Sequence, residues 1–146
     1  MTPNQHPPEY VGFWIRFLAF VIDNIAAMLV LGVIVAILFG TDVDPQDVTG
    51  LFARSLLQSL LVAALFIGLW IYFASTPGKM IFDAYIVDAK TLGNASRGQL
   101  VIRYLGYIVS TLLFFLGFVW IAFDARKQGL HDKMAGTLVI KGKPRQ

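Results

Sequence analysis

Three long apolar stretches dominate the alternation of hydrophobic and polar positions along the chain. They cover about residues 12–39, 56–74 and 102–123, and polar, turn-rich segments separate them. An α-helix rises 1.5 Å per residue, so about 20 apolar residues cross the hydrocarbon core of a bilayer. The pattern therefore predicts an all-α membrane protein with three hydrophobic helical segments. One domain, residues 10–141, would lie between a disordered tail (residues 1–9) and a basic tail (residues 142–146).

Shorter signals lie in the polar segments. Residues 81–87 and Thr137–Lys141 are rich in β-branched and aromatic side chains, which predicts two short strands that form a hairpin-like element. Ser96 and Gln99 have the spacing of a capping box, so a helix is expected to begin at Arg97. Residues 75–80 are expected to form a loop with Lys79 at the membrane interface.

The third apolar stretch allows two topologies. It is long enough for one span, but it could also bend near Ser110 or Gly117 and return as a broken or re-entrant helix. Four basic residues precede it within the polar segment or at its start, and six Lys or Arg follow it from Arg126 to Arg145. Lys and Arg favour cytoplasmic loops, and only a returning segment puts both groups on that side. Both topologies remain open at this point, with a cytoplasmic N-terminus favoured.

Composition supports a membrane location. Hydrophobic residues make up 57% of the chain and charged residues 14%, against roughly 25% charged in soluble domains. The chain has no cysteine, which excludes disulfides and thiolate metal sites. No nucleophile–base arrangement is present, so neither enzyme activity nor a cofactor is expected. The basic residues are expected to contact anionic lipid headgroups, not nucleic acid.

Two charged residues interrupt the first apolar stretch. Arg16 and Asp23 are seven residues apart, almost two helical turns, and therefore share one face with Ala19. Asp23 lies about eleven residues into the stretch, near mid-depth, where a carboxylate costs roughly 2.5–3.5 kcal/mol. Such a residue is either a site for ions or protons, with Arg16 as its neutralising partner, or half of a structural clamp between helices. A partner for Asp23 on another segment is a further alternative.

A second polar group follows the third stretch. Asp124, Arg126, His131, Asp132 and Lys133 lie within ten residues. Three protein ligands are usual for a catalytic metal, but nothing in this spacing requires one, and no metal site is predicted. The simpler interpretation is a polar network that ties the end of the third stretch to the predicted strands.

Three motifs resemble those of the RDD family of small bacterial membrane proteins, which is named for an arginine and two aspartates. They are YVGFWIRFLAFVID, TPGKMIFDAYIVDAKTLGNASRGQLVIRYLGYIVS and WIAFDARKQGLHDKMAGTLVIK. Arg16 and Asp23 match the arginine and the aspartate of the first motif, and Asp132 is matched to the second named aspartate. Asp83 departs from the pattern, because the family often has glycine there.

The resemblance implies a multi-pass protein of the bacterial cytoplasmic membrane, and some members look like monovalent-cation/proton antiporters. On this hypothesis Asp23 binds the ion or proton beside Arg16, and transport requires a homo-oligomer. The alternative is a non-transporting partner in membrane assembly, in which Arg16 and Asp23 lock the helices. Either way, the residues expected in a cytoplasmic network are Asp132, His131, Asp124, Arg103, Asp88 and Lys79.

Overall fold

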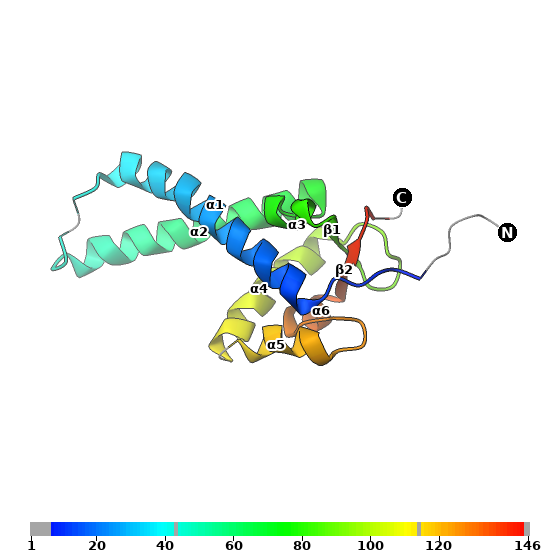
Figure 1. Ribbon diagram of the computed structural model, residues 1–146. Helices are drawn as coiled ribbons and strands as arrows, with labels where there is room; N and C mark the ends of the chain where they lie inside the picture. The colour runs from blue at the N-terminus through cyan, green and yellow to red at the C-terminus, as the bar shows by residue number, and fades with distance from the viewer. Residues whose placement is uncertain (1–6, 43, 114, 145–146) are drawn as a thin grey trace.

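The computed structural model describes residues 7–42, 44–113 and 115–144 (Figure 1). Helices α1 (Phe13–Phe39) and α2 (Val48–Phe73) pack against each other as a hairpin, and both are long and apolar enough to cross a membrane. Helix α2 begins eight residues before the predicted start. The Asp47 side chain accepts a hydrogen bond from the Gly50 backbone N–H at 2.9 Å, and this N-cap extends the helix into the acidic loop.

Arg54 closes the end of this hairpin. Its guanidinium donates hydrogen bonds to the backbone carbonyls of Phe39 (2.6 Å) and Gly40 (3.4 Å), and its carbon Cζ lies 5.4 Å from the centre of the Phe39 ring. The last carbonyls of a helix have no partner within the helix and carry partial negative charge. A cation from α2 therefore fixes the end of α1.

The third apolar stretch is broken. Helix α4 (Arg97–Leu112) begins at the predicted capping box, and α5 (Leu116–Phe123) follows at an angle of 103° to it. Strands β1 (Ala84–Asp88) and β2 (Thr137–Lys141) pair although one precedes the stretch and the other follows it. The chain therefore returns to the end at which α4 began, which agrees with the broken or re-entrant alternative and not with a straight span.

The two strands form the small antiparallel sheet that the sequence predicts, with Ala84 opposite Lys141 and Asp88 opposite Thr137. Strand β1 begins three residues later than expected because Asp83 has φ +53°. Aspartate tolerates this left-handed region better than most residues, and glycine tolerates it best, so the aspartate at position 83 suits this turn. Asp83 therefore belongs to a turn.

Two short helices were not predicted. Helix α3 (Pro77–Ile81) replaces the expected loop, with Pro77 in its first turn, where a missing N–H costs nothing. Helix α6 (Leu130–Ala135) packs against α4 and α5. Glu9, the last residue of the predicted first tail, accepts a hydrogen bond from the backbone of Lys141 at 2.9 Å. Residues 1–6 and 145–146 of the two tails lie outside the described residues.

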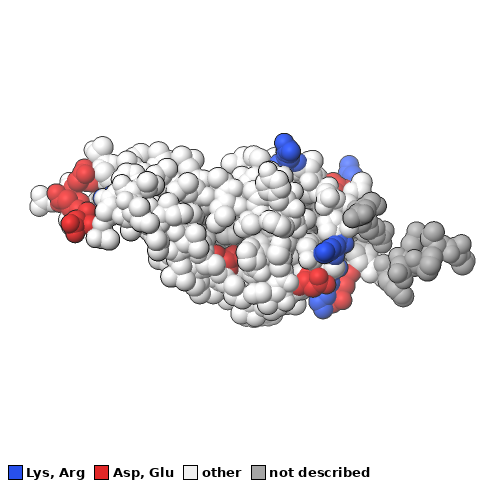
Figure 2. Space-filling view, turned by 90° about the horizontal axis from the view of Figure 1, so that it is seen from above, with Lys and Arg blue, Asp and Glu red and all other residues white. Residues whose placement is uncertain are grey.

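On the face shown in Figure 2, charged side chains gather mostly towards the two ends of the molecule, and the surface between them is largely uncharged. Asp42, Asp44 and Asp47 are exposed on the loop between α1 and α2. The sheet and both ends of the described chain lie at the opposite end (Figure 1). In the most apolar parts of α1 and α2, only 17% and 6% of the residues are buried within the chain, so lipid or other helices must cover these faces.

A buried charge cluster where α1, α4 and α6 meet

The buried face of α1 carries both of its charged residues. Arg16, Ala19, Asp23, Ala27 and Leu31 recur every three or four positions and form one stripe. The small side chain of Ala19 lets α3 come close: a Cβ atom on Gly78 would clash with the Ala19 carbonyl and lie 3.0 Å from the Asp23 carboxyl. Glycine at position 78 therefore permits the contact between α3 and α1.

Asp132 is the centre of a buried ion-pair cluster. Its carboxylate pairs with Arg16 at 2.5 Å and also with Arg103, and it accepts a hydrogen bond from the Gly129 backbone N–H at 2.9 Å. Arg103 further donates to the Thr137 hydroxyl at 2.7 Å. All of these groups are buried. The cluster joins α1, α4, α6 and the start of β2 through a single carboxylate.

The electrostatics keep Asp132 ionised. Burial alone would raise its pKa, but the guanidinium groups of Arg103 and Arg16 outweigh that effect and hold the pKa below its ordinary value. His131, packed against the rings of Tyr107 and Phe118, shows the opposite balance. Its burial lowers its pKa well below the usual 6.5 and outweighs the opposing charge of Asp132, so the ring is neutral at pH 7. The pair His131–Asp132 is thus one neutral ring beside one fixed carboxylate.

The predicted ion pair between Arg16 and Asp23 is wrong. Arg16 pairs with Asp132, and its Nε also donates to the Val11 carbonyl at 3.0 Å. Seven residues separate Arg16 from Asp23 by about 10 Å along the helix axis. A carboxylate brought to Arg16 by tertiary packing is closer than one two turns away on the same helix.

Asp23 instead binds neutral donors on another segment. Its two oxygens accept hydrogen bonds from the Thr76 hydroxyl and from the Gly78 backbone N–H at 2.7 Å. Asp23 is 4% exposed. Among the described residues, no cationic nitrogen lies within 4.0 Å of its oxygens. It is therefore a buried carboxylate without a direct ion pair.

Asp23 lies nearer to the sheet-bearing end of α1 than to the acidic loop. At 1.5 Å per residue, it is about 15 Å from Phe13 and about 24 Å from Phe39 along the helix axis. Because the whole helix, at about 40 Å, is longer than the ~30 Å hydrocarbon core, the mid-depth position of Asp23 stays a prediction. Arg16 and its cluster lie closer still to the sheet-bearing end.

Lys79 is buried, contrary to the expected interfacial position. Because Pro77 begins a helix, Lys79 turns inward, and its ammonium nitrogen lies 5.7 Å from the centre of the Trp70 ring. Arg103 lies 5.6 Å from the centre of the same ring. Burial, the largest influence, lowers the pKa of Lys79. The Trp70 ring thus lies beside two buried cations.

The remaining two predicted network residues form separate turns. Asp88 accepts hydrogen bonds from the backbone of Lys90 and Thr91, both at 2.8 Å, and from the Gln99 side chain at 2.6 Å. These bonds lower its pKa to about 2. Asp124 ends α5 and pairs with Lys133 at 2.5 Å, which lowers its pKa. Neither aspartate contacts the buried cluster, so they position the chain around it.

Sequence reasoning did not identify several contacts of the site. Thr76, Trp70 and Thr137 touch the charged groups, yet each is an ordinary residue type for its element. The only local signal was Thr76-Pro77, a typical N-cap and first-turn pair for a helix.

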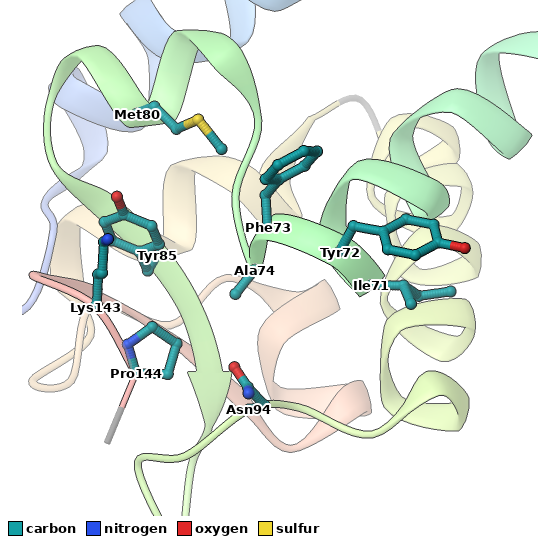
Figure 3. A pocket seen from close by; sticks show the side chains of 9 residues that line it. All are labelled: Ile71, Tyr72, Phe73, Ala74, Met80, Tyr85, Asn94, Lys143 and Pro144. Carbon is teal, nitrogen blue, oxygen red and sulfur yellow. The ribbon is translucent and has the colours of Figure 1, made fainter. Parts of the chain in front are cut away.

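A cavity of about 430 Å³ lies away from the cluster (Figure 3). Its walls come from the end of α2, from α3 and β1, and from the segments that follow β1 and β2. Among the described residues, Lys143 is the charged residue that lines it, beside Tyr85, Phe73 and Met80. None of the predicted site residues lines it.

Comparison with known proteins gives this arrangement a family context. The RDD family model matches residues 10–136. Protein YteJ of Bacillus subtilis, described as an uncharacterized membrane protein, is 30% identical over 92% of this chain and 82% of its own length. Uncharacterized protein YxaI of the same organism is 32% identical over 88% of this chain and 95% of its own length.

Uncharacterized protein RP437 of Rickettsia prowazekii is 43% identical over 56% of this chain, and the match spans only 45% of that relative. No solved structure matches the chain significantly. The match to the family model covers the first two motifs and the third as far as residue 136, and it therefore includes Arg16, Asp23, Arg103 and Asp132. The chain is a membrane protein that belongs to the RDD family.

Proposed function

We propose that the chain exchanges a monovalent cation for protons across the membrane, with Asp23 binding the two in turn. The observation that carries this proposal is the partner set of Asp23. A buried carboxylate held by a hydroxyl and a backbone N–H keeps its charge available for a cation or a proton. A carboxylate fixed to a guanidinium, as in Asp132, does not.

The surroundings of Asp23 support binding of a small cation. The Thr76 hydroxyl and the Ala19 carbonyl lie beside the carboxylate, so oxygen atoms from α1 and from the N-cap of α3 meet there. Hard cations prefer oxygen ligands. Because Asp23 is buried and α3 supplies both of its hydrogen-bond donors, exchange of the bound ion would require movement of α3.

We place the protein in the bacterial cytoplasmic membrane with the sheet-bearing end in the cytoplasm. Arg54 is the single described Lys or Arg near the acidic loop, whereas Lys90, Arg97, Arg126 and Lys133 lie in segments that belong to the opposite end. Lys and Arg accumulate on the cytoplasmic side of bacterial membrane proteins. This orientation also brings the basic residues to anionic headgroups.

A second candidate function is that of a non-transporting assembly partner. The low burial of α1 and α2 within one chain favours it, because two spans leave wide apolar faces for neighbouring helices. The same faces fit a homo-oligomer, which the transport hypothesis also requires. On this alternative, the Arg16–Asp132–Arg103 cluster is a lock that holds the docking surface in shape.

Proteoliposomes separate the two functions. The purified protein is reconstituted with an internal pH dye, a proton gradient is imposed, and Na⁺, Li⁺ or K⁺ is added outside. Transport predicts a cation-dependent change in dye signal that Asp23→Asn abolishes and Asp83→Asn leaves intact, since Asp83 is exposed in a turn. A folded, correctly oriented preparation that gives no cation response contradicts transport and leaves the assembly function.

A further inference from the structure

Three hydrogen-bond donors in the cluster have no acceptor among the described residues. They are Arg16 Nη2, Arg103 Nε and Trp70 Nε1, and all three atoms are buried. Each unmatched buried donor costs about 1–3 kcal/mol, and more when it is charged. Arg16 and Arg103 bind the same carboxylate, and Arg103 lies 5.6 Å from the centre of the Trp70 ring. The unmatched donors therefore belong to one region, where α1, α2 and α4 meet.

The same region carries an excess of positive charge. Arg16, Lys79 and Arg103 are three buried cations, whereas Asp23 and Asp132 are two buried carboxylates, so one positive charge remains. The Lys79 ammonium lies beside Trp70 at 5.7 Å from the ring centre. Burial is the largest influence on the pKa of Lys79 and lowers it, whereas the charge of Asp23 acts in the opposite direction. A buried charge without a partner is strongly unfavourable.

We infer that a small monovalent inorganic anion, of about the size of chloride, binds between Arg16, Trp70, Lys79 and Arg103. Such an ion supplies the missing negative charge and accepts several N–H bonds at once. A water molecule brings no charge and accepts only about two such bonds. The four residues are at most 7% exposed, which favours a small ion over the larger phosphate of a lipid headgroup. The anion would complete the charge cluster whether or not the protein transports cations.

Trp70 gives a direct probe of this site. The chain has three tryptophans, and the other two, Trp14 and Trp120, are 73% and 55% exposed. Replacing both by phenylalanine leaves Trp70 as the single fluorophore. The purified variant is titrated in detergent with sodium bromide against a sodium gluconate background of constant ionic strength. We expect quenching that saturates and that chloride reverses, while the neutral quencher acrylamide has little effect because Trp70 is buried.

Charge variants test the assignment further. Lys79→Met removes the excess charge without a large change of shape, and we expect bromide to bind at least tenfold more weakly. Lys90→Met, at an exposed position, is the matched control and should leave the titration unchanged. Circular dichroism and the elution volume establish that each variant is folded.

Several results would overturn the inference. They are quenching that rises linearly without saturation, quenching that chloride does not reverse, or a folded Lys79→Met variant that binds bromide as well as its parent. Water molecules would then be the acceptors for these three donors. Displacement of bromide by phosphatidylglycerol added to the detergent micelles, but not by chloride, would overturn the choice of a small ion in favour of a lipid phosphate. If Lys79→Met does not fold, the chloride competition on the parent protein decides.

Discussion

Replacing Asp132 by asparagine should destabilise the protein by about 3–5 kcal/mol, the cost of breaking a buried ion pair by removing one partner. The change preserves shape and one acceptor oxygen, so the hydrogen bond from the Gly129 backbone can survive. It removes the only carboxylate that contacts Arg16 and Arg103 among the described residues, and it leaves two buried guanidinium groups uncompensated. Because every 1.4 kcal/mol is a factor of ten, the unfolding equilibrium should shift by a factor of about 100 or more.

The assay is reversible unfolding in mixed micelles, in which sodium dodecyl sulfate is raised and near-UV circular dichroism follows the loss of packing. Asp83→Asn is the control, since its exposed carboxylate in the turn before β1 should change the free energy of unfolding by less than about 0.5 kcal/mol. A double-mutant cycle with Arg16→Met should be strongly non-additive, because the two side chains share one interaction. A loss below about 1 kcal/mol for Asp132→Asn, or an additive cycle, would refute the view that this carboxylate holds the four elements together.

Three further predictions concern the surroundings of the cluster. The carboxyl group of Asp88, followed by NMR at its carboxyl carbon, should titrate with a pKa of about 2. Because this pKa is depressed in the folded protein, ionised Asp88 stabilises the fold above about pH 4, and this stabilisation is lost as the pH falls through 2. A pKa of ordinary value would contradict the turn geometry. Gly78→Ala should cost about 1–3 kcal/mol in the same unfolding assay through the clash with α1, whereas Gly98→Ala, which meets nothing within 4 Å, should be neutral or stabilising. Arg54→Met should speed amide hydrogen exchange near the end of α1 and leave exchange in the rest of the chain unchanged, because Arg54 binds the last carbonyls of that helix. Unchanged exchange near the end of α1 would mean that those hydrogen bonds do not stabilise the helix end in the membrane.

The sequence predicted the elements whose signal is long or local. Two apolar stretches gave α1 and α2, the capping box gave the start of α4, and β2 has its predicted bounds. Helices α3 and α6 have five and six residues, and segments so short carry little apolar periodicity. The break between α4 and α5 was one of two alternatives from the sequence, with a bend expected near Ser110 or Gly117, and hydropathy and the placement of basic residues conflicted over it. The pairing of β1 with β2 resolves that conflict.

Local sequence patterns could not identify the partners of the charged residues in the site. Arg16 and Asp132 are 116 residues apart in sequence, and Asp23 and Thr76 are 53 apart. Helical spacing relates positions on one helix only, so it suggested Asp23 as the partner of Arg16. Which carboxylate reaches Arg16 depends on how α6 packs on α4, and that is a property of the tertiary fold.

The two buried aspartates therefore have different roles, and their variants should separate them. Asp132 holds two cations in place, so Asp132→Asn should lose stability and any transport together. Asp23 has neutral partners, and asparagine keeps an acceptor for one of them. Asp23→Asn should therefore unfold within about 1.5 kcal/mol of the parent, the usual net value of one hydrogen bond, while it loses the cation response in proteoliposomes. If Asp23→Asn destabilises the chain as much as Asp132→Asn does, both aspartates serve packing, and the assembly function becomes the better account of Asp23.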